Sequence, residues 1–185
     1  MPLRRFEYLI GELMTKKEFL NAVSNGKEDV VQILLDALSH LNVDYCVIGG
    51  LAVNAYAEPI VSLDLDIIIT MEEVDAVCEY LSQRFHIERF EHSVNLKSPR
   101  SDLRIQIQTD PRYQEFIQRS KVREVLGYEM KVADVADVLQ GKVWAFQDES
   151  RRKSKRQKDL ADIMRLVETY PSLMDTLPEA VREHI

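Results

Sequence analysis

The stretch that decides the fold lies between residues 45 and 69 and reads YCVIGGLAVNAYAEPIVSLDLDIII. It opens with a β-rich run that ends at Gly49 and Gly50, and a short helical pattern follows and stops near Pro59. After Ser62, apolar and acidic residues alternate, which predicts a second strand. The stretch therefore predicts a strand, a glycine turn, a helix and a strand in that order.

Asp64 and Asp66 lie two residues apart on the second predicted strand. Successive side chains of a strand point to opposite faces, so the two carboxylates share one face, roughly 7 Å apart along the chain. The other face is apolar, with Leu63, Leu65 and Ile67. Two like charges on one face repel each other and resist burial. A hard divalent ion such as Mg²⁺ or Mn²⁺ removes this conflict, because it binds one or two carboxylates together with phosphates.

Each half of this pattern also has a plain structural explanation. An Asp-x-Asp pair is common on a solvent-exposed edge strand, and a glycine pair can be a simple tight connection. The combination is more specific, because glycines let the backbone approach a phosphate and free N–H groups at a helix start favour an anion. Together the two halves predict that a triphosphate binds at Gly49 and Gly50 and its metal at Asp64 and Asp66.

A resemblance to the nucleotidyltransferase superfamily is carried by the run GGLAVNAYAEPIVSLDLDIII. More narrowly, the run resembles minimal bacterial members related to the AbiEii-type abortive-infection toxins. The resemblance implies that Gly49 and Gly50 hold the phosphates of a nucleoside triphosphate and that Asp64 and Asp66 hold divalent metal. Ser62 stands where the family often has a polar residue just before the two aspartates.

A third carboxylate is usually supplied by a later central strand of the superfamily. The matching strand here is residues 102–108, and the matching position, after an arginine and an apolar residue, is Gln106. A glutamine can offer its carbonyl oxygen to a metal or hydrogen-bond a substrate, but it cannot act as a base. Asp102 lies on the same face of the predicted strand, about 13 Å away, and Asp110 lies at its far end.

The second family-like segment lies in the C-terminal third of the chain. AbiEii-type proteins resemble it in having a lysine on one helix, then a turn rich in arginine and lysine, then a Lys-Asp-x-x-Asp helix. The matching residues are Lys142, Lys158, Asp159 and Asp162. The resemblance implies that the lysines contact the phosphates and that an aspartate lies near the site.

Six cations fall within residues 151–158, namely Arg151, Arg152, Lys153, Lys155, Arg156 and Lys158. A solvated helix start would explain them. However, cations at a helix N-terminus oppose the helix dipole, which favours a partner anion. That anion is either the triphosphate or the backbone of an RNA.

The whole chain is expected to have an α/β (α+β) fold, a nucleotidyltransferase-like mixed sheet with helices on one side and a helical C-terminal part. We expect an N-terminal helical extension over residues 1–26, the core over 27–131 and a helical part packed on it over 132–185. Helices are predicted at 6–22, 28–41, 71–85, 111–120, 132–146 and 155–170. Further strands are predicted at 86–91, 94–97 and 102–108, with a hairpin over 123–133.

Composition limits the class of protein. Of 185 residues, 45% are apolar and 30% charged, and the net charge of −7 argues against a general nucleic-acid binder. No apolar run approaches the roughly 20 residues of a membrane span, and the first residues lack the apolar segment of a signal peptide, so a cytoplasmic protein is expected. Cys46 and Cys78 are expected to be reduced core thiols and Trp144 a core residue, with His86 and His92 on the surface.

Two functions are compatible with these patterns. One is an enzyme that transfers a nucleoside monophosphate from a nucleoside triphosphate to a hydroxyl of RNA or protein, with Mg²⁺, in a toxin–antitoxin-like context. In it, Lys142 and Lys158 would steady charge on the leaving group. The alternative is a catalytically degenerate protein that binds nucleotide or a partner protein and acts as a regulator. A purely structural role for the acidic strand is the third possibility.

Overall fold

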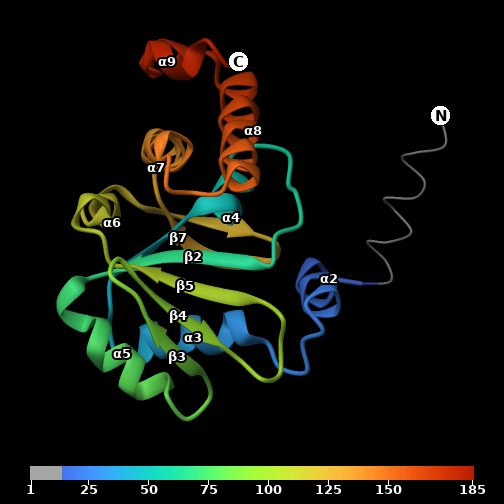
Figure 1. The fold of residues 1–185 in the computed structure, drawn as a ribbon. Coiled ribbons are helices and arrows are strands. Elements are labelled where there is room, and N and C mark those ends of the chain that lie inside the picture. The colour runs from blue at the N-terminus through green and yellow to red at the C-terminus, as the bar shows by residue number, and fades with distance from the viewer. Residues whose placement is uncertain (1–13) are drawn as a thin grey trace.

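The computed structural model describes residues 14–185, in which seven strands form one mixed sheet (Figure 1). The strands are β1 (Tyr45–Ile48), β2 (Asp64–Ile69), β3 (His86–Arg89), β4 (Ser93–Lys97), β5 (Arg104–Gln108), β6 (Lys121–Val125) and β7 (Tyr128–Val132). In space they run in the order β3-β4-β5-β2-β1-β7-β6. The β2–β5 and β1–β7 neighbours are parallel and the other neighbours are antiparallel.

Helices cover both faces of this sheet. They are α2 (Lys16–Val23), α3 (Val30–His40), α4 (Gly49–Val53), α5 (Val74–Leu81), α6 (Phe116–Arg119), α7 (Val135–Gln147), α8 (Lys153–Thr169) and α9 (Glu179–Arg182), with 3₁₀ turns η1 (Met71–Glu73), η2 (Pro111–Tyr113) and η3 (Pro171–Thr176). Figure 1 shows α3 and α5 on one face and α4, α6 and α7 on the other. The α/β class with a mixed sheet is therefore confirmed.

The expectation that helices lie on one side only was wrong, and strand β2 shows why. Ile67 and Ile69 point to one face and Ile68 to the other, because successive side chains alternate. Each of the three is at most 1% exposed. A strand that is apolar on both faces needs cover on both, since uncovered apolar surface loses about 25 cal/mol per Å².

Two predicted helices, 71–85 and 111–120, are divided in the structure, and the first consists of η1 followed by α5, which ends at Leu81. Residues 111–120 form η2 and α6 instead of one helix, and the side chain of Gln114 between them donates to the Ile69 carbonyl oxygen of β2 (3.2 Å). Of the helix predicted at 6–22, residues 6–13 lie outside the described residues. The remainder corresponds to α2, which starts at a capping box in which Thr15 and Glu18 each bond the other's backbone N–H.

Several side chains lie where the sequence placed them. Cys46 and Cys78 are buried free thiols. Trp144 is half-buried against the core, edge-on to Tyr113 and stacked on Phe116, with ring centroids 5.2 and 5.9 Å apart. His86 and His92 are exposed. Across residues 14–185, no helix is both long and apolar enough to cross a bilayer.

Candidate nucleotide and metal site

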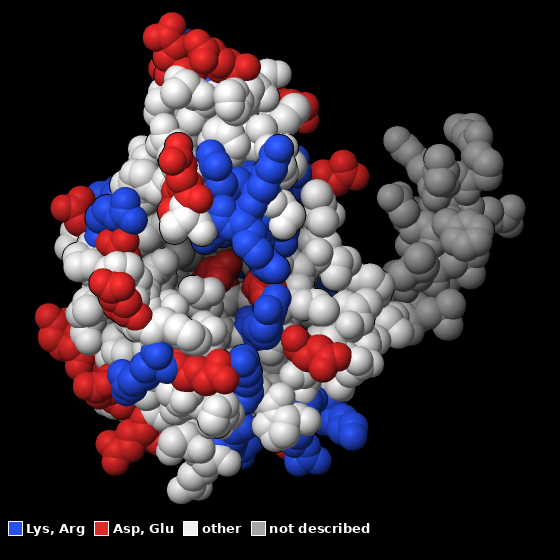
Figure 2. Space-filling model, in the orientation of Figure 1, with Lys and Arg blue, Asp and Glu red and all other residues white. Residues whose placement is uncertain are grey.

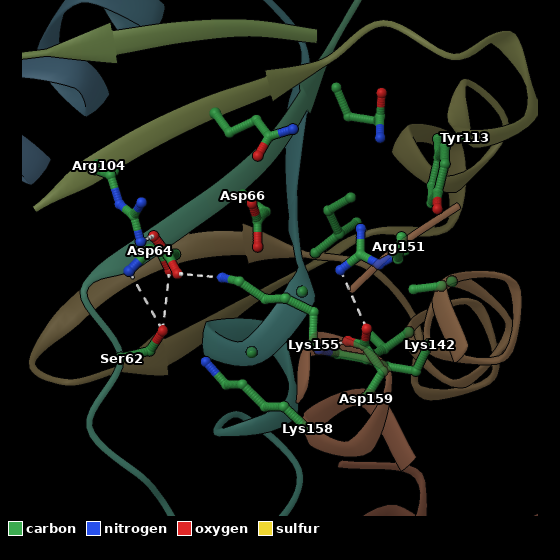
Figure 3. A pocket seen from close by; sticks show the side chains of 18 of the residues that line it. Ser62, Asp64, Asp66, Arg104, Tyr113, Lys142, Arg151, Lys155, Lys158 and Asp159 are labelled. Carbon is green, nitrogen blue, oxygen red and sulfur yellow. Dashed lines mark hydrogen bonds and ion pairs between the residues drawn. The ribbon is translucent and has the colours of Figure 1, made fainter. Parts of the chain in front are cut away.

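A pocket lies on the sheet face that α4, α6 and α7 cover (Figure 3). It brings together side chains from β2, β4 and β5 with residues from α7 and α8. All predicted site residues except Asp162 line it, namely Gly49, Gly50, Ser62, Asp64, Asp66, Gln106, Lys142, Lys158 and Asp159. The two family-like segments of the sequence therefore meet in one place.

Strand register sets the floor of this pocket. In the parallel pair of β2 and β5, Asp66 lies opposite Gln106 and Asp64 lies opposite Arg104. The antiparallel strand β4 continues the first row, because Asn95 lies opposite Gln106. Asp66, Gln106 and Asn95 thus form a row of polar side chains across three strands, and the Oδ1 atom of Asn95 is buried without a hydrogen-bond partner.

Gly49 makes the close contact on which this floor depends. Its φ is +70°, a conformation that favours glycine, and a Cβ placed on it would lie 2.2 Å from Oδ2 of Asp66. Ile48, just before it, is the register partner of Asp66. The carboxylate therefore fills the space that any other side chain at position 49 would need. Gly50 is different, because a Cβ there would find only ordinary contact, 3.7 Å from Oγ of Ser62.

Asp64 is surrounded by positive charge. Its Oδ1 accepts an ion pair from Nη2 of Arg104 at 2.7 Å, and its Oδ2 lies 3.9 Å from Nζ of Lys155 on α8. The backbone N–H of Asp64 donates to Oγ of Ser62 (3.3 Å), which ties that hydroxyl to the start of β2. Figure 3 shows Asp64 between the Arg104 and Lys155 side chains.

Asp66 has no such partner. Among the described residues, no ion pair or hydrogen bond reaches its carboxylate, and Figure 3 shows it projecting into the pocket. Burial raises the pKa of the Asp66 carboxyl above its ordinary value, the positive charge of Lys142 acts against this, and the negative charge of Asp64 adds to it. Asp66 is thus a carboxylate that lacks a counter-cation.

The two carboxylates fit a hard divalent ion. No group of three or more His, Cys, Asp or Glu side chains arranged for a metal exists within residues 14–185. Mg²⁺ does not require one, since it is commonly held by one or two carboxylates and completes its shell with water and substrate phosphates. Asp66, with its unpaired charge, and Asp64 beside it are the residues that would hold the ion.

Lys142 is held in a buried ion-pair network at the wall of the pocket. Its Nζ lies 2.9 Å from Oδ1 of Asp159 and 2.6 Å from Oδ2 of Asp162, and all three side chains are at most 8% exposed. Arg151 also pairs with Asp159, and Arg165 with Asp162. Burial opposes the charge of Lys142, but the two carboxylates outweigh it and raise the pKa of Lys142. Phosphate contact by Lys142 stays a prediction, and it would compete with these pairs.

Neither further acid considered from the sequence lines the pocket. Asp102 precedes β5 and accepts from Nδ2 of Asn25 at 2.6 Å. Asp110 holds the guanidinium of Arg112 at 2.7 Å. An acid that sequence reasoning missed, Asp137 on α7, does line the pocket, but both of its oxygens accept from the side chain of Arg119 (2.8 and 2.9 Å).

The sequence contains a pattern that could have identified the side of α7 that faces the pocket. Asp137, Gly141 and Ala145 recur every four residues, so they share one helix face, and all three line the pocket. Small residues on that face keep the pocket open. Sequence reasoning missed Asn95, Arg104 and Tyr113, which line it too, whereas Arg151 and Lys155 belong to the cation cluster for which it favoured a partner anion.

The mouth of the pocket is positively charged although the chain is acidic. Figure 2 shows a column of Lys and Arg side chains over a hollow with acidic atoms at its bottom. The cations that line the pocket are Lys97, Arg104, Lys142, Arg151, Lys155 and Lys158. Opposite charges at mouth and floor suit a ligand that combines a metal cation with anionic phosphates.

Replacing Gly49 by alanine should destabilise the fold by about 1–3 kcal/mol, since the new side chain combines backbone strain with a collision against Asp66. Gly50→Ala is the matched control and should change the stability by less than about 1 kcal/mol in either direction, because space exists for its Cβ and alanine suits a helix. Urea-induced unfolding followed by circular dichroism measures both. Equal losses in the two variants would contradict this contact.

Replacing Asp66 by asparagine should stabilise the fold at neutral pH. The folded pKa of Asp66 is raised, so ionisation costs more in the folded than in the unfolded state. This free-energy cost has its full size at pH values above the pKa that Asp66 has in the folded protein. It disappears as the pH falls towards the pKa of an aspartate in the unfolded protein, about 3.9. The gain of Asp66→Asn should therefore shrink on acidification.

Thermal denaturation in EDTA between about pH 4 and pH 8 measures this difference. Asp64→Asn is the matched control, and it should bring no gain because it removes the partner of Arg104. An Asp66→Asn protein that is no more stable than wild type at pH 7, or whose gain is independent of pH, would refute the unpaired state of Asp66.

Comparisons with solved structures show the same fold in other proteins. ANT(2'')-Ia in complex with adenylyl-2''-tobramycin is 12% identical, with a TM-score of 0.60, and the match covers 84% of this chain and 96% of that one. Lincomycin-bound LnuA, a lincosamide antibiotic adenylyltransferase, is 14% identical, with a TM-score of 0.54, over 76% and 98% of the two chains. The Thermotoga maritima protein TM1012 is 16% identical, with a TM-score of 0.53, over 74% and 90%.

Comparison with curated proteins gave no match. By contrast, residues 46–185 match the family described as nucleotidyl transferase AbiEii toxin, type IV TA system. The matched region contains both the glycine–aspartate stretch and the lysine-rich helix that form the pocket. Since it spans most of the chain, the protein belongs to the AbiEii family of nucleotidyltransferases.

Proposed function

We propose that this protein binds a nucleoside triphosphate together with Mg²⁺ or Mn²⁺ and transfers the nucleoside monophosphate to a hydroxyl of RNA or protein. The bond that forms joins the acceptor oxygen to the α-phosphorus, and the proton of the acceptor hydroxyl leaves to solvent water. The bond that breaks joins that phosphorus to the oxygen of the departing pyrophosphate. The observation that carries the proposal is Asp66, a partly buried carboxylate without a paired cation, beside Asp64 and against the backbone of Gly49.

In this proposal the chain supplies binding and orientation. Gly50, which leaves open space next to Ser62, lets phosphate oxygens approach the backbone. Lys158 is exposed at the pocket wall and is free to balance negative charge on the leaving group. A divalent ion bound at Asp64 and Asp66 would neutralise phosphate charge. Gln106, adjacent to Asp66, would orient the acceptor by hydrogen bonding.

The family description names a toxin of a type IV toxin–antitoxin system, which supports a toxin–antitoxin setting for this protein. In that setting the transfer would disable an RNA or protein of the cell, and a second protein, the antitoxin, would counteract it. The toxic action on RNA or protein and the antitoxin partner are both part of the proposal.

A second candidate function is favoured by Gln106. Each pocket acid other than Asp64 and Asp66 is already bound, Asp137 by Arg119 and Asp159 by Lys142 and Arg151. No carboxylate among the described residues is therefore placed to take the acceptor's proton next to Asp66. The second candidate is a protein that binds nucleotide without turnover and acts as a regulator.

Incubation with Mg²⁺, each labelled nucleoside triphosphate, total RNA and total cell protein should transfer label in the wild type and not in Asp64→Ala plus Asp66→Ala. The matched control is Glu72→Ala plus Glu79→Ala, which removes the same charge from exposed sites outside the pocket and should transfer normally. Binding without transfer would favour the second candidate. A wild type that binds no triphosphate would refute both.

Gln106→Glu should distinguish the two candidates further. It restores a carboxylate at the register partner of Asp66, so metal affinity should rise and transfer should speed up about tenfold or more. In the degenerate protein the same change should create transfer that the wild type lacks. Titration with Mn²⁺, read by its paramagnetic resonance signal, and the labelling assay measure both effects. Unchanged metal affinity would show that position 106 does not face the metal.

A further inference from the structure

The negative charge of Asp64 is already neutralised by the protein itself, whereas that of Asp66 is not. Arg104 reaches Oδ1 of Asp64 from the neighbouring strand, at 2.7 Å, and Lys155 lies 3.9 Å from Oδ2. The Arg104 pair follows from sheet register, because the two residues are direct partners in β2 and β5. A metal that uses Asp64 must therefore compete with two cations built into the fold.

These two cations differ from Lys142 in their freedom to move. The side chain of Arg104 is 60% exposed and that of Lys155 is 41% exposed, against 8% for Lys142. Lys142 is fixed between two buried carboxylates, while Asp64 is the only described acid that pairs with Arg104 or Lys155. A cation that leaves Asp64 would therefore give up the one carboxylate with which it pairs among the described residues.

A divalent ion alone would meet an unfavourable environment here. Placed at Asp64 it would lie close to both the guanidinium and the ammonium group, and like charges a few ångströms apart repel strongly in a pocket. A triphosphate removes this repulsion, because its several negative charges can pair with both cations as they leave Asp64.

We propose that Arg104 and Lys155 are binding residues for the triphosphate, and that they move from Asp64 to the phosphates when the metal enters. The metal then binds Asp64 together with the nucleotide and not before it. Both side chains line the pocket, from opposite sides of Asp64 (Figure 3). This inference rests on the proposed function, since it assumes a metal–triphosphate ligand at Asp64 and Asp66.

The proposal predicts opposite effects on two affinities. Arg104→Gln and, independently, Lys155→Gln should strengthen binding of Mn²⁺ alone by about three- to tenfold, because Asp64 is released. The same variants should weaken binding of Mg²⁺–tripolyphosphate, and of Mg²⁺ with each nucleoside triphosphate, by about three- to tenfold. Paramagnetic resonance of Mn²⁺ and isothermal titration calorimetry measure the two affinities without any turnover.

Matched controls remove the same charges outside the pocket. Arg100→Gln breaks an ion pair with Glu28 (2.8 Å) in the loop before β5, and Lys153→Gln removes a cation from the first turn of α8. Neither residue lines the pocket, so neither variant should change either affinity. Circular dichroism checks that each variant is folded, and because Arg104 and Lys155 lie on different elements, one folded variant is sufficient for the test.

The outcomes distinguish a failure of the cation exchange from a failure of the proposed function. A gain for Mn²⁺ alone combined with a loss for the triphosphate, absent in both controls, supports the exchange. If the two affinities fall together, or if Mn²⁺ affinity stays unchanged, the exchange is refuted while the proposed function stands. If wild-type protein binds no nucleoside triphosphate with Mg²⁺, the proposed function fails and the exchange fails with it.

Discussion

The Asp66 carboxylate rests against the backbone of Gly49, in space that only glycine leaves open. This contact lies where β1 ends and helix α4 begins, and it joins that point to the middle of the pocket floor. It also holds a carboxylate in a place where burial disfavours its charge. The glycine turn, the strand register and the electrostatics of the pocket therefore depend on one another at this point.

Near that contact, Asp64 and Asp66 have different electrostatic surroundings. Asp64 has an exposed cation at each carboxylate oxygen, while no cation pairs with Asp66 among the described residues. The difference arises from position, because Asp64 lies opposite Arg104 at the rim and Asp66 lies opposite the neutral Gln106 further along the strands. In the proposed exchange, Asp66 is open to a metal from the start, and Asp64 becomes open when the nucleotide draws its two cations away.

The C-terminal helices reach the site through buried charges. Lys142 on α7 is joined to Asp159 and Asp162 on α8, and α8 in turn carries Lys155 and Lys158 to the pocket. Breaking a buried pair leaves an uncompensated charge and costs about 3–5 kcal/mol. The network therefore fixes how α8 lies on the core, which makes it as relevant to the geometry of the site as any residue that lines the pocket.

The sequence by itself determined the mixed sheet, the glycine turn and the shared face of Asp64 and Asp66, because these follow from local alternation and from residues close in the chain. Through the resemblance to the family it also identified Gln106 as the position of the third carboxylate, which the strand register places opposite Asp66. Only the tertiary structure decided that Arg104 and Lys155 hold Asp64, that Lys142 is buried between two acids, and that Asp137 and Asn95 reach the pocket. The reason is physical: these contacts join residues far apart in the chain, and they depend on strand order and helix packing, which no local pattern specifies.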